Sequence, residues 1–291
     1  MKGTRQRWME AGFLAGVLLL GGAAVSAQSS QGGQSSPPAQ QGDKSKPASS
    51  DTLTLDTPAP PVNPEEDAAY KAFDTIPMTD GVKKIAAGEA FVQKYPQSRY
   101  LAPVYSNLVK LYLSANDVPK MQDAGEKCIA LAPDDVQTLA ILGQTLPRAW
   151  NSTMPNAQQQ LDKAEKFSKS AIELTPTIVK PAGLSDAQFD LAKNQTLAMA
   201  HAGLGLVYFR RGKLDQAIPE FEESVKVDPS PEIDPVNYYL LGLADEKTSH
   251  YDAAVTAFTK CATVAGSLQA TCKSGAEEAK KLGATQLSAP K

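Results

Sequence analysis

The sequence predicts an all-α protein, a solenoid of stacked helix–turn–helix units. From about residue 65 onward, apolar residues recur with helical spacing, and the pattern itself repeats. The two best copies share a motif at an offset of 37 residues: Leu204-Gly205, Ala217 and Phe221 in one, Leu241-Gly242, Ala254 and Phe258 in the other. A period of this length is typical of stacked repeats, in which each unit buries its apolar face on its neighbour.

The composition agrees with a soluble helical protein and argues against one class of partner. Hydrophobic residues make up 42% of the chain, which suffices for a packed core, and charged residues make up 21%. The formal net charge is −3. Because nucleic-acid binders normally show a basic excess, we expect no nucleic-acid partner.

The first 27 residues have the layout of a secretory signal peptide. Lys2, Arg5 and Arg7 precede an apolar run over residues 11–24, and small residues lie just before Gln28. As a helix this run would span about 21 Å, less than the roughly 30 Å core of a bilayer. We therefore expect export, to the periplasm or as a secreted protein. The alternative is an uncleaved N-terminal segment that anchors the chain, which would be its only contact with a membrane.

Residues 28–64 are expected to form a disordered linker. Ser, Gln, Gly and Pro dominate this segment. It therefore has little apolar surface whose burial would offset the entropy lost on ordering. A flexible chain of this length reaches roughly 35 Å on average. Such a linker would hold a folded domain away from a membrane or wall, or act as a simple spacer.

The helical region, residues 65–284, divides into about five units and a capping helix. The units cover 65–96, 102–135, 136–176 and two copies within 198–266. Residues 148–156 are inserted between the helices of the third unit. A second insertion, 177–184, precedes a long helix predicted from Ser185 to Arg211.

The capping helix is predicted over 267–284, and residues 285–291 form a tail. Ser267 is its expected N-cap and Gly283 its expected stop. Its charged residues suit a helix that covers the last unit and faces water.

The best copy resembles the tetratricopeptide repeat, a helix–turn–helix unit of 34 residues. The residues that carry the resemblance are His201, Leu204, Gly205, Tyr208, Gly212, Ala217, Phe221, Ser224 and Pro229. His201 and Asp245 stand where the family usually has aromatic residues. The resemblance implies a right-handed superhelix in which the first helices of successive units line a concave groove.

Gly205 is unusual because glycine in a helix interior costs about 1 kcal/mol relative to alanine. We expect Gly205 to face Ala217 across the two helices of one unit, so that the helix backbones approach closely. Pro229 is expected to end the second helix, because proline has no amide hydrogen.

The sequence offers little catalytic chemistry. No phosphate-binding glycine loop, serine-hydrolase motif or zinc-protease motif occurs, and the two histidines have no ligand-spaced partners. We therefore expect no enzyme activity, no cofactor and no metal. The alternative is an enzyme whose site lies in the inserted segments 147–160 or 177–195.

The resemblance also implies a set of groove residues. Its groove positions correspond to Asn107, Lys110, Gln144, Arg148, Leu206, Phe209, Arg210, Tyr239 and Lys247. Arg148, Arg210 and Lys247 share one position in three repeats, which would suit an acidic peptide or a chain's C-terminal carboxylate. The alternative is that cations are simply common at an exposed position. We expect a non-catalytic envelope scaffold that binds a protein or peptide partner.

Two of the three cysteines are candidates for a disulfide. In the family, the position of Cys261 packs against the next helix, and Cys272 lies early on that helix. Export would place the pair in an oxidising compartment, where disulfides persist. The alternative is that both are small core residues. Cys128 occupies the equivalent slot of an earlier repeat and is expected to be buried and free.

Overall fold

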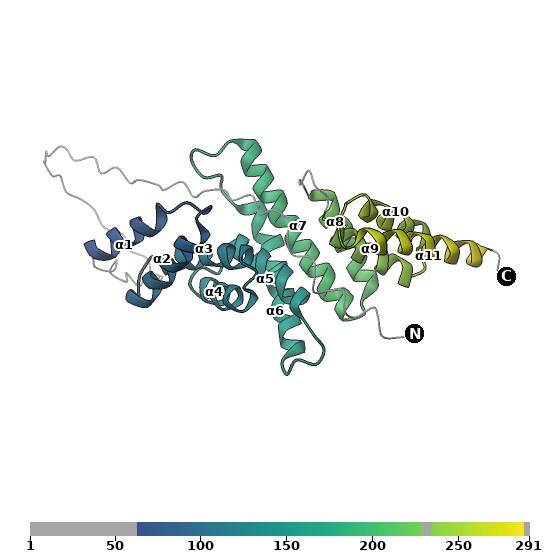
Figure 1. The fold of residues 1–291 in the computed structure, drawn as a ribbon, viewed down its shortest axis with the longest axis horizontal. Coiled ribbons are helices and arrows are strands. Elements are labelled where there is room, and N and C mark those ends of the chain that lie inside the picture. The colour runs from purple at the N-terminus through teal and green to yellow at the C-terminus, as the bar shows by residue number, and fades with distance from the viewer. Residues whose placement is uncertain (1–62, 229–233, 288–291) are drawn as a thin grey trace, which may run out of the picture.

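In the computed structural model, which describes residues 63–228 and 234–287, the chain is a row of packed α-helices (Figure 1). No strand occurs within these ranges. The α-helices are α1 (Pro64–Asp74), α2 (Gly81–Lys94), α3 (Leu101–Ser114), α4 (Val118–Leu131), α5 (Val136–Ala149), α6 (Ala157–Leu174), α7 (Asp186–Arg210), α8 (Leu214–Val227), α9 (Pro235–Lys247), α10 (Tyr251–Ala262) and α11 (Gln269–Leu287). A single 3₁₀ turn, η1 (Thr175–Thr177), follows α6. The all-α prediction is confirmed.

The α-helices form successive antiparallel pairs, α1/α2 through α9/α10, with α11 packed against α10 and α9. The predicted signal peptide and all but the last two residues of the predicted linker lie outside the described residues, and so does Pro229. No helix in the described part of the chain combines the length and hydropathy that a membrane span requires.

Helix α7, with 25 residues, is the longest of the described helices, as predicted from its sequence. Ser185 begins it with a capping box, in which the Ser185 hydroxyl accepts from the Gln188 amide and the Gln188 side chain accepts from the Ser185 amide. Helix α7 contacts α5, α6, α8 and α9. It therefore joins the N-terminal pairs to the C-terminal pairs in the middle of the row (Figure 1).

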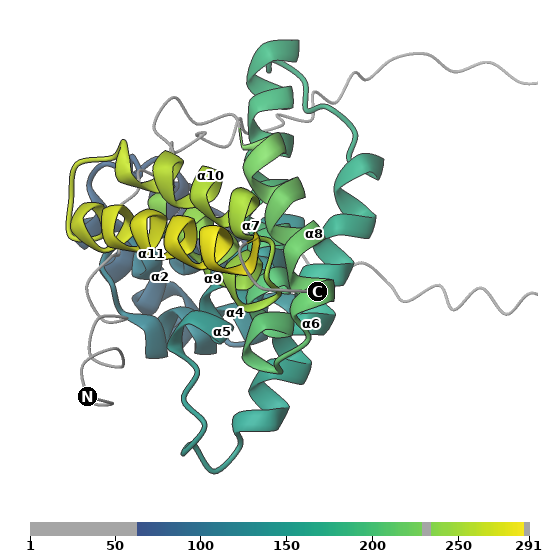
Figure 2. The ribbon, with the colours of Figure 1, turned by 90° about the vertical axis from the view of Figure 1, so that its right-hand side faces the viewer.

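The two inserted segments project from opposite edges of the stack (Figures 1 and 2). One is the turn between α5 and α6, residues 150–156, and the other lies between η1 and α7. Because they lie so far apart, they do not combine into a single site.

The side chain nearest to Gly205 is Phe221 and not the expected Ala217. A Cβ atom built on Gly205 would lie 2.8 Å from Cδ1 of Phe221, and the three nearest atoms all belong to that ring. Gly242 has the same relation to Phe258 one repeat later, at 2.7 Å. The glycine therefore makes room for an aromatic ring of the second helix, one turn beyond the expected alanine.

The C-terminal helix also differs from its prediction. It begins at Gln269, not beside Ser267, and continues through Gly283 to Leu287, into the expected tail. Gly283 lies against Tyr251 of α10, where a Cβ would come within 3.2 Å of the tyrosine Cβ. This glycine thus serves close packing inside a helix and does not end it.

Candidate partner-binding surface

The first helices of the pairs contact one another in series along one side of the molecule. Helix α3 contacts α5, α5 contacts α7, α7 contacts α9, and α9 contacts α11. Each of the second helices α4, α6 and α8 lies against the two first helices that flank it. We call α3, α5, α7 and α9 the inner row. Helices in mutual contact form the shorter side of a curved stack, so this row is the candidate binding surface.

The predicted groove residues come from all four helices of the inner row, but their environments differ. Asn107, Lys110, Gln144, Phe209 and Tyr239 are half-buried, and Lys247 is exposed. Leu206 is only 3% exposed and belongs to the core between α7, α8 and α9. Leu206 is therefore a core residue, which corrects its assignment to the groove.

The two aromatic groove residues pack partly against second helices. The ring of Phe209 lies 6.5 Å from that of Phe221, and the ring of Tyr239 lies 6.0 Å from that of Phe258. Both rings keep part of their surface accessible. Each ring is thus packed on one side and partly accessible to solvent, as an apolar contact residue requires.

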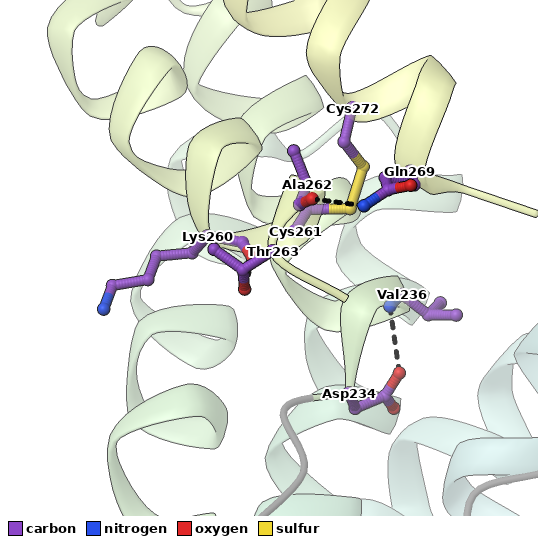
Figure 3. Close-up of a disulfide and its surroundings, with 8 residues drawn as sticks. All are labelled: Asp234, Val236, Lys260, Cys261, Ala262, Thr263, Gln269 and Cys272. Atoms are coloured by element: carbon purple, nitrogen blue, oxygen red, sulfur yellow. Dashed lines mark hydrogen bonds between the residues drawn. A yellow bond between two sulfur atoms is a disulfide. The ribbon is translucent and has the colours of Figure 1, made fainter. Parts of the chain in front are cut away.

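Arg148 is engaged inside the protein. Its Nη2 atom lies 3.4 Å from a carboxylate oxygen of Asp234 and 3.5 Å from the amide oxygen of Asn237. Asp234 also accepts a hydrogen bond from the Val236 amide and so caps α9 (Figure 3). Since the Arg148 side chain is only 16% exposed, this pair joins α5 to α9.

Arg210 is also held by the fold. Its Nε donates to the carbonyl of Pro147 at 3.3 Å, and its guanidinium lies 5.5 Å from the centre of the Trp150 ring. Burial lowers the pKa of Arg210. The three cations of the predicted basic stripe therefore differ, because Lys247 is exposed while both arginines brace neighbouring helices.

Lys110 has a different environment, in the first half of the inner row. No carboxylate of the described residues lies within 4.0 Å of its ammonium group. Burial lowers the pKa of Lys110, and Asp135 opposes this effect only from a longer distance. Asn107, one turn earlier on α3, donates its amide to the carbonyl of Pro103. Lys110 is thus a desolvated cation without an ion-pair partner in the described chain.

Sequence reasoning missed the roles of Asp234 and Asn237. An acidic residue directly before a proline is a helix-start signal, so the N-cap at Asp234 was readable from the sequence. The contact of Asp234 with Arg148, 86 residues away, could not be predicted from the sequence. Within the described ranges, no cluster of three or more His, Cys, Asp or Glu side chains is arranged to hold a metal ion.

Cys261 and Cys272 are joined as a disulfide between α10 and α11 (Figure 3). Their Cα atoms are 5.8 Å apart, and both residues are fully buried. The Gln269 side chain donates to the carbonyl of Ala262 beside the bond. Cys128 is buried and takes part in no disulfide.

Two segments of the chain match the sequence profile of the tetratricopeptide repeat, residues 198–231 and residues 236–267. These matches cover α7 from its middle onward with α8, and α9 with α10. A search of curated proteins gave no match.

Two solved structures show limited similarity. One is a thermophilic TPR protein of Thermus thermophilus, at 15% identity and a TM-score of 0.45, over 72% of this chain and 98% of that one. The other is PilW, a type IV pilus biogenesis factor, at 13% identity and a TM-score of 0.47, over 77% of this chain and 93% of that one. At these scores neither supports a functional argument. The two profile matches, together with the helix pairs α7/α8 and α9/α10, show tetratricopeptide repeats over residues 198–231 and 236–267 of this chain.

Proposed function

We propose that this protein is a non-catalytic scaffold that binds a segment of another protein along the inner row. The observation that carries the proposal is the series of contacts among α3, α5, α7 and α9, which gathers side chains from four repeats on one side. Phe209 and Tyr239 offer apolar surface there, and Gln144 and Lys247 offer polar groups. A surface of this kind suits an extended or helical peptide, which meets several repeats at once.

The scaffold acts outside the cytosol in this proposal, in the periplasm or as a secreted protein. The basic start and apolar run of residues 1–27 support export. A disulfide between α10 and α11 also suits an oxidising compartment. Cell fractionation and mass spectrometry test this part. We expect an exported chain that begins at Gln28, and a cytosolic chain with its first residues intact would contradict export.

Site-specific photo-crosslinking tests the binding surface. A photoreactive amino acid is placed at Gln144 or Lys247 on the inner row, and at Gln216 or Thr256 on second helices as matched controls. All but the half-buried Gln144 are exposed. We expect one partner to crosslink from both inner positions and from neither control. Crosslinks that come equally from the second helices would refute the inner row as the binding surface.

A further inference from the structure

We propose that the inner row binds an acidic, extended segment of its partner, with a side-chain carboxylate of that segment on Lys110. This inference rests on the proposed scaffold function and names the chemistry of the partner. In this proposal the cation that binds the partner is Lys110, and not Arg148 or Arg210, which the repeat alignment suggested.

No acidic residue lies on α3, on α5 or on α7 from Leu191 onward. Lys110 is the single charged residue of α3, and Arg148 is the single charged residue of α5. From Leu191 to its end, α7 has Lys193, His201 and Arg210 but no acid. The pattern is confined to α3, α5 and α7, since α1 and α9 both contain acidic residues.

Most carboxylates carried by the helices of these repeats lie on the second helices. They are Asp123 and Glu126 on α4, Asp162, Glu165 and Glu173 on α6, and Asp215, Glu220, Glu222 and Glu223 on α8. The second helices also carry lysines, so cations occur on both rows, whereas the acidic residues of these helices are concentrated on the second row. Electrostatic complementarity then favours an acidic segment on the inner row.

Arg148 and Arg210 are poorly suited to bind that segment. Arg148 already pairs with Asp234, and Arg210 donates to the Pro147 carbonyl. A ligand that recruited either arginine would have to break a contact between helices. Lys110 has no such contact to lose.

The surroundings of Lys110 explain why it remains without a carboxylate. The nearest acid that acts on it, Asp135, is the N-cap of α5 and accepts from the Thr138 amide at 2.9 Å and from the Cys128 thiol. The ammonium of Lys84 is a second cation close enough to feel the charge of Lys110. Lys84 is satisfied by the carbonyls of Asp74 and Ile76, at 3.2 and 2.7 Å.

A desolvated cation of this kind destabilises the unliganded protein and gains from an incoming anion. Burial lowers the pKa of Lys110, so water no longer fully solvates its charge. A carboxylate of the partner would replace the lost hydration of Lys110 by a charge-assisted hydrogen bond. Groups retained at such a cost are frequently binding residues.

A display library of random peptides with amidated C-termini tests the inference on the full mature chain. We expect selection to enrich peptides rich in Asp and Glu. A selected peptide should then bind Lys110→Met about tenfold or more weakly, because a charged hydrogen bond is lost. Lys110→Arg should recover part of the affinity. Lys226→Met is the matched control, since Lys226 is an exposed lysine on α8, and should change affinity by less than about twofold.

The outcomes separate the two proposals. Enriched peptides without acidic residues, or binding unaffected by Lys110→Met, would overturn this inference and leave the scaffold function standing. A library that yields no binder at all would overturn the scaffold function as well. The melting temperature of Lys110→Met checks the folded state. It should stay equal or rise, because an unpaired desolvated charge is removed, and a marked fall would contradict the environment assigned to Lys110.

Discussion

Gly203 of α7 lies directly against the backbone of Gly143 in α5. A Cβ atom on Gly203 would come within 2.5 Å of the Gly143 carbonyl oxygen and 2.8 Å of the Gln144 amide nitrogen. Pro147, four residues after Gly143, has no amide hydrogen to donate to that carbonyl within the helix. The backbones of α5 and α7 thus come into close contact where a glycine of each helix meets.

This contact predicts a difference between two neighbouring glycines. Gly203→Ala should destabilise the protein by about 1–3 kcal/mol, because the added methyl meets backbone that cannot move aside. Gly205→Ala is the matched control in the same helix, with the same gain in helix propensity. Its methyl meets a side chain, the Phe221 ring, and not backbone, so the loss should be smaller. Urea unfolding measures both, and an equal loss would argue against the backbone contact.

Arg148→Met should lower stability by about 1–3 kcal/mol, because it removes a partly buried ion pair and leaves Asp234 without that partner. Lys247→Met is the control on the same row. Because Lys247 is exposed, its effect should stay within about 0.5 kcal/mol. Thermal unfolding compares them. Reversing Arg148, Arg210 and Lys247 together would therefore perturb the fold as well as any partner contact. An Arg148→Met protein as stable as the control would mean that the pair does not brace α5 against α9.

Thiol titration tests the pairing of Cys261 with Cys272. The native protein should show no reactive thiol, because Cys128 is buried and burial raises its pKa to about 12. The denatured, unreduced protein should show one, and Cys128→Ser should show none. Three thiols would contradict the disulfide.

Loss of the disulfide should destabilise the C-terminal helix most. Cys272→Ser should cost roughly 3 kcal/mol on the chain-entropy argument for a loop of this size. Few large side chains of α11 are buried, and its fully buried residues are Cys272 and Ala279. Hydrogen exchange should therefore accelerate in α11 before the rest of the chain. Unchanged protection in α11 would show that packing alone holds this helix.

The raised pKa of Asp245 predicts that the folded protein loses stability as pH rises. Burial, with the nearby charge of Glu222, raises the pKa of Asp245 from 3.8 to about 6, although His250 opposes the shift. Because the folded protein holds this proton more tightly, the stabilisation is full below about pH 3.8 and is lost as pH rises through about 6. The loss is up to about 3 kcal/mol for a shift of this size.

Asp245→Asn should remove this pH dependence and make the protein more stable than wild type at pH 7. Asp215→Asn on the exposed surface of α8 makes the same change in charge and serves as the control. Chemical unfolding between pH 4 and pH 7.5 measures both. A wild-type protein whose stability does not fall between pH 4 and 7 relative to Asp245→Asn would rule out the raised pKa.

Local sequence patterns were enough to predict several elements. The helical period and the 37-residue offset predicted paired helices, and the helical run from Ser185 to Arg211 predicted a long α7. The offset also aligns Asp245 with Tyr208, which marks an acid in a slot that another repeat fills with an aromatic residue. These features depend on neighbours within one repeat, where chain connectivity limits the possible partners.

Contacts between repeats were not predictable in the same way. Gly205 and Gly203 are both small residues in one helix, yet one meets the Phe221 ring and the other meets the backbone of α5. Likewise, Lys110 and Arg148 occupy groove positions on neighbouring first helices, but only Arg148 meets a carboxylate, 86 residues away.

The sequence by itself determined the helices, their pairing and the cysteines able to join α10 to α11, because these follow from periodicity and short-range spacing. Only the tertiary structure decided which cations brace neighbouring helices and which one lies without a carboxylate partner among the described residues. Ion pairing and desolvation depend on distances of a few ångströms between helices, and those distances are set when the whole stack packs together.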